Sequence, residues 1–248
     1  MSDFLLEPGI LDNIKNSSLF YPCSGNDLLT SINLFSPYVT HFMFVDRGYF
    51  IPGHQDTKWY GYDQPAEQVY PVLWKDKRYK LIDRYVLEPR SYPINSPWDI
   101  VPCTLMEYYF HIETGRTIRI CRRRGYGYSA FRKEVEKLGV FFYRGDSQGE
   151  GGSGNHWLSN EHINEVCNKL IDKGLLVLDG SDGSPYIRKK GIYKELFSRS
   201  VGQHPYDYVT SKKSFFDPEG RHFRCVGYAG LRYGPTLMWQ VTRSKNIA

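Results

Sequence analysis

Two short stretches hold residues whose types and spacing suit the binding of a nucleoside cofactor. In "YPCSGND", residues 21–27, Ser24 and Gly25 follow an apolar run and would let a ligand approach the backbone closely. In "FMFVD", a second apolar run ends in Asp46, 21 residues after Gly25. An acid at about that distance can accept hydrogen bonds from ribose hydroxyls. An acid after a strand can equally be a turn or cap residue, so the spacing leaves both interpretations open.

A glycine-rich loop holds the next group of candidates. The loop "DSQGEGGSGNHW" follows the apolar run "VFFYRG". Ligands of open α/β sheets bind beyond the carboxyl ends of the strands, where this loop is expected. Asp146, Glu150 and His156 would contact a cofactor or substrate there. A flexible surface loop is the alternative, and the loop is not a phosphate-binding P-loop, because no Gly-Lys-Ser/Thr follows it.

The third candidate region is basic. Residues 116–133 hold seven positive charges and no acid, with aromatic residues interleaved. Arginine beside aromatic rings can contact phosphates and stack on bases. The densest part, Arg122, Arg123 and Arg124, is therefore a candidate anion-binding site. Alternating arginines also keep an exposed strand soluble, which is the competing interpretation.

Charge and cysteine content limit the class of protein. A formal net charge of +5 permits an anionic partner without requiring one. The five cysteines lie far apart and form no CxxC, which argues against a disulfide framework and against a zinc site, so no metal is predicted. No apolar run is long enough for a membrane span, and the first residues carry acids where a signal peptide carries Lys or Arg. We therefore expect a cytoplasmic protein without a membrane partner.

Apolar periodicity predicts strands that alternate with helices. Each strand is a nearly continuous apolar run, which is typical of an α/β sheet covered on both faces. We expect one domain over residues 1–248, with a Pro/Tyr-rich insertion or cap at about residues 50–105. The strands are predicted at 17–22, 38–46, 79–87, 104–125 (a hairpin), 140–146, 175–183 and 221–243 (a closing pair), and the helices at 26–35, 66–74, 129–139 and 159–174. The sequence also predicts the ends of these elements: Asn26 or Asp27 and Ser159 as helix caps, Gly139 and Gly174 as helix stops, and Gly115 in the hairpin turn.

This order resembles class I S-adenosylmethionine-dependent methyltransferases. "LFYPCSGNDL" is similar to the first strand and glycine turn of that family, "FMFVD" to the second strand with its acid, and "GVFFYRGD" to the fourth. "CNKLIDKGLLVLDGSDG" looks like the helix, turn and fifth strand, and "FRCVGYAGLRYGPTLMWQVTR" like the closing antiparallel pair. The resemblance implies a Rossmann-like three-layer sandwich, a mostly parallel sheet ending in an antiparallel strand pair.

The resemblance also implies a cofactor, S-adenosylmethionine, and a set of residues that bind it. Asp46 would hold the ribose, the turn would approach the cofactor backbone, and Asp146 would close over it. The chain departs from the family pattern at Tyr21, where an acid is usual, and in its turn, where only Gly25 of three glycines is present. "RGDS" replaces the tetrapeptide typical of enzymes that methylate base amino groups. The implied cofactor-binding residues are Tyr21, Cys23, Ser24, Gly25, Asp27, Asp46 and Asp146.

Two functions remain as hypotheses. The first is a methyltransferase with an unknown acceptor, in which no catalytic base is required, because the sulfonium of the cofactor carries the reactivity and the protein aligns the acceptor. The second is an inactive module that binds a nucleotide, nucleic acid or protein partner through the basic segment 116–133. A broken glycine motif favours the second, and the position of Asp46 favours the first.

Overall fold

The computed structural model describes residues 4–49, 51–52, 69–88, 102–144, 157–179, 190–197, 205–229 and 236–243. The chain divides into two compact units. One comprises residues 18–135, and the other comprises residues 1–17 together with 136–248.

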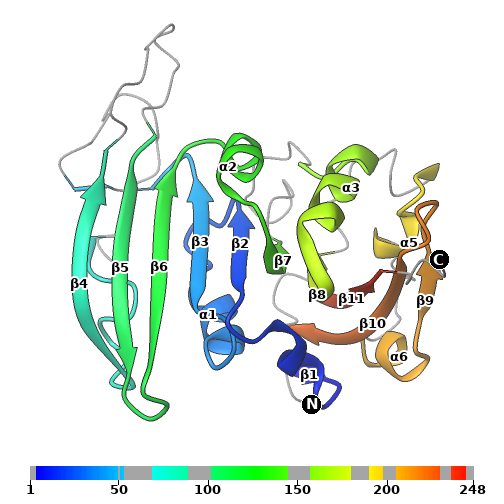
Figure 1. Ribbon diagram of the computed structural model, residues 1–248, viewed down its shortest axis with the longest axis horizontal. Coiled ribbons are helices and arrows are strands. Elements are labelled where there is room, and N and C mark those ends of the chain that lie inside the picture. The colour runs from blue at the N-terminus through cyan, green and yellow to red at the C-terminus, as the bar shows by residue number, and fades with distance from the viewer. Residues whose placement is uncertain are drawn as a thin grey trace, which may run out of the picture. The chain divides into compact units, whose positions relative to one another are not determined.

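Five strands form the sheet of the unit 18–135. They are β2 (Ser18–Pro22), β3 (His41–Asp46), β4 (Tyr79–Leu87), β5 (Thr104–His111) and β6 (Arg116–Arg124), in the order β2-β3-β6-β5-β4 (Figure 1). The pairs β2–β3 and β3–β6 are parallel, whereas β6–β5 and β5–β4 are antiparallel. Two helices accompany the sheet, α1 (Leu29–Phe35) and α2 (Gly127–Glu134).

The hairpin β5–β6 forms where the sequence predicts it. Gly115 closes its turn with a φ of 66°, a left-handed conformation that glycine adopts without strain, and its N–H donates to the carbonyl oxygen of His111 at 2.9 Å. The parallel crossover between β2 and β3 is confirmed as well, with Tyr21 beside Phe44. The helix that connects them begins later than predicted, with Leu28 and not Asn26 or Asp27 at its N-cap.

Side chains alternate between two faces of this sheet. The inner face includes Phe42, Phe44, Ile120, Glu107 and Tyr109, all at most 1% exposed. The outer face includes their neighbours along each strand, such as Met43, Cys121 and Tyr108. Helix α2 covers the outer face over β2 and β3, where the rings of Phe20 and Phe131 lie 5.4 Å apart between centroids.

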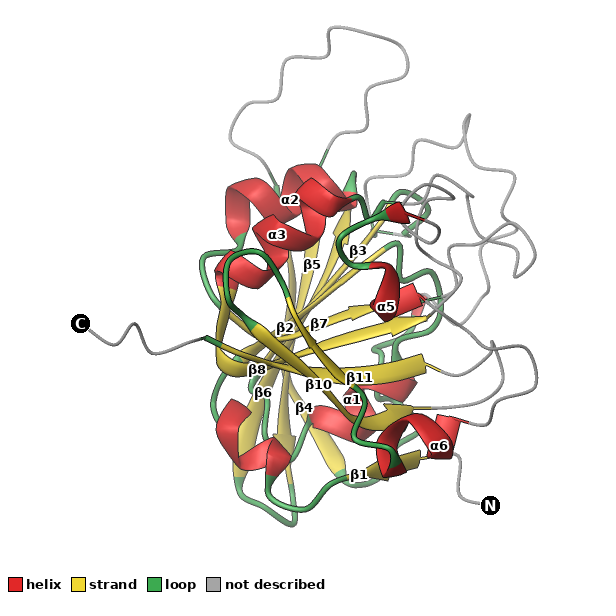
Figure 2. Ribbon diagram, turned by 90° about the vertical axis from the view of Figure 1, so that its right-hand side faces the viewer, coloured by secondary structure: helices red, strands yellow, loops and turns green. Residues whose placement is uncertain are grey.

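Six strands belong to the other unit. They are β1 (Phe4–Leu6), β7 (Leu138–Tyr143), β8 (Leu170–Asp179), β9 (Ser214–Phe216), β10 (His222–Ala229) and β11 (Thr236–Thr242). Their order is β1-β10-β11-β8-β7, with β9 also paired to β10, and only β7–β8 is parallel. The predicted closing pair, β10 and β11, is confirmed. The helices are η1 (Ile10–Ile14), α3 (Asn160–Lys169), α5 (Lys194–Phe197) and α6 (Pro205–Thr210), and α6 packs on β10 (Figure 2).

Predicted helix boundaries hold at one terminus and fail at others. Ser159 caps α3 as predicted, because its side chain accepts from the N–H of His162. The helix then ends at Lys169, and β8 starts at once, five residues before the predicted stop. The predicted stop of α2, Gly139, lies inside β7 instead. A Cβ at this position would lie 1.8 Å from Ser17 Oγ, so the strand needs a glycine here for close packing. Residues 70–75 form turns and bends, not the helix predicted there.

The predicted mostly parallel three-layer sandwich is wrong. The described residues form a large mixed set of eleven strands with few helices. In the unit 18–135 the meander β4-β5-β6 accounts for the error, because antiparallel neighbours are joined by short turns and need no crossover helix. The sequence predicts the hairpin β5–β6, but not that β4 extends it, nor that β1 and β9 add antiparallel strands to the other unit. Large parts of the predicted insertion at 50–105 lie outside the described residues, so its role stays a prediction.

Candidate cofactor-binding site

Parallel pairing brings the carboxyl ends of β2 and β3 to one edge of the sheet. Pro22 lies beside Val45, and the N–H of Ser24 extends the ladder by donating to the carbonyl oxygen of Val45 at 3.3 Å. The third parallel strand, β6, ends at the same edge, with Arg124 beside Asp46. The loops that follow these three strands are therefore neighbours, and this edge is where ligands of parallel sheets bind (Figure 1).

The turn after β2 has an unusual backbone. Cys23 and Gly25 have φ angles of 52° and 49°, in the left-handed region that is uncommon for residues other than glycine. The N–H of Asp27 donates to the carbonyl oxygen of Ser24 at 2.9 Å and closes the turn. A Cβ added at Gly25 would meet nothing within 4 Å, so the turn leaves space beside its backbone.

Asp46 connects this turn to the loop after β3. Its Oδ2 accepts from the N–H of Gly25 at 2.9 Å, and its Oδ1 accepts from the N–H of Gly48 at 2.7 Å. The carboxylate is half-buried and has about four lone-pair positions. The side chain predicted to hold a ribose thus also fixes the geometry of both loops.

Tyr49 stabilises the turn after β2 through a contact with Ser24. Its hydroxyl and the Ser24 hydroxyl are hydrogen-bonded, and Ser24 Oγ in turn donates to the carbonyl oxygen of Val45 at 3.4 Å. Burial, and to a lesser extent the charge of Asp46, raise the pKa of Tyr49 well above its usual value. The phenol therefore stays protonated, and because the Ser24 hydroxyl donates its proton to Val45, the Tyr49 hydroxyl is the donor to Ser24. This contact explains why Ser24 is 3% exposed, so that it supports the site rather than facing a ligand.

Tyr21 and Asp27 contact each other. The Tyr21 hydroxyl donates to Asp27 Oδ2 at 3.0 Å, and Thr30 Oγ1 donates to Asp27 Oδ1 at the same distance. Tyr21 is 1% exposed, so we assign it a structural role in place of the predicted contact with a cofactor. Cys23 is half-exposed and remains accessible at the surface of the turn.

The loop after β6 adds an aromatic ring to the same edge. The N–H of Gly125 donates to the carbonyl oxygen of Asp46 at 3.0 Å, which holds this loop against β3. Tyr126 follows and is 47% exposed, with the guanidinium carbon of Arg47 4.9 Å from its ring centroid. The sequence indicates neither Gly48, Tyr49 nor the pair Arg47–Tyr126 as site residues, because their proximity depends on which strand lies beside β3.

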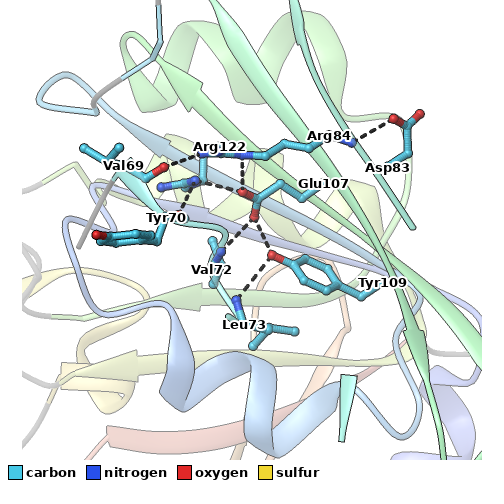
Figure 3. A network of polar contacts seen from close by, with 9 residues as sticks. All are labelled: Val69, Tyr70, Val72, Leu73, Asp83, Arg84, Glu107, Tyr109 and Arg122. Carbon is cyan, nitrogen blue, oxygen red and sulfur yellow. Dashed lines mark hydrogen bonds and ion pairs between the residues drawn. The ribbon is translucent and has the colours of Figure 1, made fainter. Parts of the chain in front are cut away.

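The arginines of β6 separate into the two faces of the sheet. Arg122 is on the inner face, 2% exposed, and its Nη2 donates to Glu107 Oε1 at 2.9 Å (Figure 3). Arg124 is 7% exposed, and Arg123 pairs with Glu134 of α2. The prediction of one anion-binding cluster made from Arg122, Arg123 and Arg124 therefore does not fit their placement.

Glu107 is the centre of a buried network that includes Arg122. Arg84 Nε donates to its Oε1 at 3.0 Å, and Tyr109 Oη donates to its Oε2 at 2.9 Å. The N–H of Val72 also donates to Oε2, at 3.0 Å (Figure 3). Burial, with the charge of Glu107, raises the pKa of Tyr109 far above its usual value, so this phenol stays a donor. The network anchors the chain around Val72 onto the inner face and has a structural role.

Asp146, Glu150 and His156 lie outside the described residues, and their contacts stay predictions. Within the described residues, no group of three or more His, Cys, Asp or Glu side chains is arranged to hold a metal ion, and no helix has the length and apolar character needed to cross a membrane. No protein family model, no curated protein and no solved structure matches this chain.

Proposed function

We propose that the unit 18–135 binds S-adenosylmethionine at the edge formed by β2, β3 and β6, and that the protein is methyltransferase-like. The observation that carries the proposal is the position of Asp46. It lies at the carboxyl end of β3, 2.9 Å from the backbone nitrogen of the Gly25 turn. A ligand that meets this turn would therefore also meet a carboxylate.

The residues of this edge fit the parts of such a cofactor. The half-buried Asp46 carboxylate suits the ribose hydroxyls, and the open side of Gly25 suits a close approach of ligand atoms. The exposed ring of Tyr126 offers a flat apolar surface for the base. Bound there, the cofactor would supply an activated methyl group, and the protein would position the acceptor and exclude water.

Strand order within each unit also supports the proposal. In the unit 18–135, β2, β3 and β6 are parallel neighbours. In the other unit, β8 is parallel to β7, and β11 lies on the other side of β8 and is antiparallel to it. Strand β10 pairs antiparallel with β11, and these two strands form the closing pair that the resemblance includes. The proposal does not require the mostly parallel sandwich that the structure excludes.

Calorimetric titration with S-adenosylmethionine and S-adenosylhomocysteine tests the proposal. We expect micromolar binding by the native protein and a loss of at least tenfold in Asp46→Asn, whose amide NH₂ would face a backbone N–H. Asp12→Asn is the matched control, because Asp12 is an acid with a side chain 60% exposed in the other unit. Absence of binding of either compound to the folded native protein would rule out the proposal.

Asp46→Asn also perturbs the two loops, so a second variant separates the two roles. Asp46→Glu keeps the charge and moves it by one methylene. If binding falls in both variants while thermal melting of the free proteins changes little, the carboxylate contacts the ligand. If binding falls only in proportion to stability, Asp46 is a structural connection and the ligand lies elsewhere.

A further inference from the structure

The outer face of β4, β5 and β6 carries a row of aromatic side chains. Register places Phe110 beside Thr117 of β6 and Lys80 of β4, and Tyr108 beside Arg119 and Asp83. One step further along, Met106 lies beside Cys121 and Tyr85. Residues directly opposite in an antiparallel pair point to the same face. We call the surface made by Lys80, Tyr85, Tyr108, Phe110 and Arg119 the aromatic face.

Solvent reaches this surface. Phe110 is 38% and Tyr85 is 39% exposed, and Leu87, on the same side, is 49% exposed. Helix α2 packs on this side of the unit, where it contacts β2 and β3 and not β4, β5 or β6 in the main contacts between elements. An antiparallel sheet with one open side normally presents polar residues there. Exposed rings in that position are therefore a feature that folding alone does not explain.

The rings are already arranged side by side. The ring planes of Tyr85 and Tyr108 are inclined by 20° with centroids 6.1 Å apart, and their hydroxyl oxygens are 3.4 Å apart. Phe110 continues the row from Tyr108 along β5, two residues further on the same face. Rings held by a sheet lose little conformational freedom when a planar ligand stacks on them.

Cationic side chains border the rings. Arg119 lies directly opposite Tyr108 and is half-buried, with its Nε in the buried part of the side chain. Lys80 is exposed beside Phe110. The acid of this row, Asp83, accepts from the N–H of Arg84 at 2.8 Å. Positive charge is thus placed next to the rings, within reach of the phosphates of a ligand whose bases lie on them.

We propose that the aromatic face binds single-stranded nucleic acid, with bases stacked on Tyr108, Phe110 and Tyr85 and phosphates paired with Arg119 and Lys80. Sheet surfaces with exposed aromatics stack unpaired bases in this way, and every base has a face that can stack. A duplex keeps its bases stacked on one another and cannot use the rings. The proposal is independent of cofactor binding, because none of these residues belongs to the edge around Asp46.

This surface differs from the basic segment that the sequence indicates. Arg122 and Arg124 are buried on the inner face or its edge, and Arg123 pairs with Glu134. Of the arginines within β6, Arg119 is the one that combines an outer-face position with an aromatic neighbour on the next strand. A test must therefore change Arg119 and the rings of β5, not the triple-arginine stretch.

Fluorescence anisotropy with labelled oligo(dT) and oligo(U) of about 20 nucleotides tests the proposal. Tyr108→Leu and Phe110→Leu keep apolar side chains and remove the rings, and each should weaken binding at least about fivefold. Phe216→Leu is the matched control, since Phe216 is 68% exposed on β9 in the other unit, and it should bind as the native protein does. Circular dichroism verifies that all variants are folded.

Salt dependence identifies the phosphate contact. The slope of log Kd against log salt concentration should fall by about 0.7 in Arg119→Gln, the contribution of one phosphate contact to a single strand, and stay unchanged in Lys15→Gln. A structural role for Arg119 would not change this slope. The proposal is overturned if folded native protein binds neither oligonucleotide at low salt, or if the control variants weaken binding equally. It is also overturned if the leucine variants instead dissociate a dimer in sedimentation, which would make the partner a second copy of the chain.

Discussion

Substituting Glu107 by Gln should destabilise the unit 18–135 by about 3–5 kcal/mol. The carboxylate is fully buried and accepts from Arg84, Arg122, Tyr109 and Val72. A glutamine has one acceptor oxygen, and its NH₂ must face donors on the other side. If the oxygen faces the two arginines, the N–H of Val72 loses its acceptor.

The magnitude follows from these contacts. An orphaned buried donor costs about 1–3 kcal/mol. Two hydrogen bonds between guanidinium and carboxylate become bonds to a neutral amide and lose about half their strength, roughly 1 kcal/mol each. The sum agrees with the 3–5 kcal/mol measured on average when one partner of a buried ion pair is removed.

Hydrogen exchange followed by mass spectrometry measures this effect locally. The backbone amides of Val72 and Leu73 donate to Glu107 and Tyr109, so the peptide that contains them should exchange at least about a hundredfold faster in Glu107→Gln. Glu113→Gln, at the exposed turn of the same hairpin, is the control and should exchange as the native protein does. An exchange rate within threefold of native in Glu107→Gln would refute the reasoning.

Three further predictions concern single residues. Ser159→Ala removes the acceptor of the His162 N–H and should destabilise α3 by about 1 kcal/mol, which urea unfolding measures. Gly127→Ala places a Cβ 2.6 Å from Pro22 Cβ and should cost about 1–3 kcal/mol in the same assay, whereas an unchanged midpoint would mean that α2 shifts freely. Burial raises the pKa of Cys121 from 9.0 to about 11, so the folded state holds a proton that the unfolded state loses. The contribution of Cys121 to stability is present below pH 9 and should fall by about 1.4 kcal/mol per pH unit up to pH 11, so the stability of Cys121→Val should fall less steeply than that of the native protein by this amount.

Local patterns were sufficient for several elements of the fold. The apolar runs that end at Pro22 and Asp46 became adjacent parallel strands, Gly115 formed the predicted turn, and Ser159 capped α3. Each depends on a few neighbouring residues whose preferences agree with the final structure. Gly139 shows the limit, because a glycine that reads as a helix stop is needed for close packing in β7.

The face of the sheet on which each side chain lies was not predicted from the sequence. The seven cations of residues 116–133 appear as one surface in the sequence, but strand alternation sends Arg122 to the buried face and Arg119 to the open one. Glu107 becomes the partner of Arg122 only because β5 and β6 pair in this register. The mostly parallel sandwich was wrong because β4 extends the predicted hairpin into a meander and because β1 and β9 add further antiparallel strands.

Protection of Cys23 from alkylation tests the cofactor-binding edge most directly. Cys23 lies in the turn beside Gly25 and is half-exposed, whereas the other four cysteines are buried. We expect S-adenosylhomocysteine to slow the alkylation of Cys23 in a saturable way, as measured by mass spectrometry, and Asp46→Asn to abolish this protection. An alkylation rate of Cys23 that stays constant up to millimolar ligand would contradict a cofactor site at this edge.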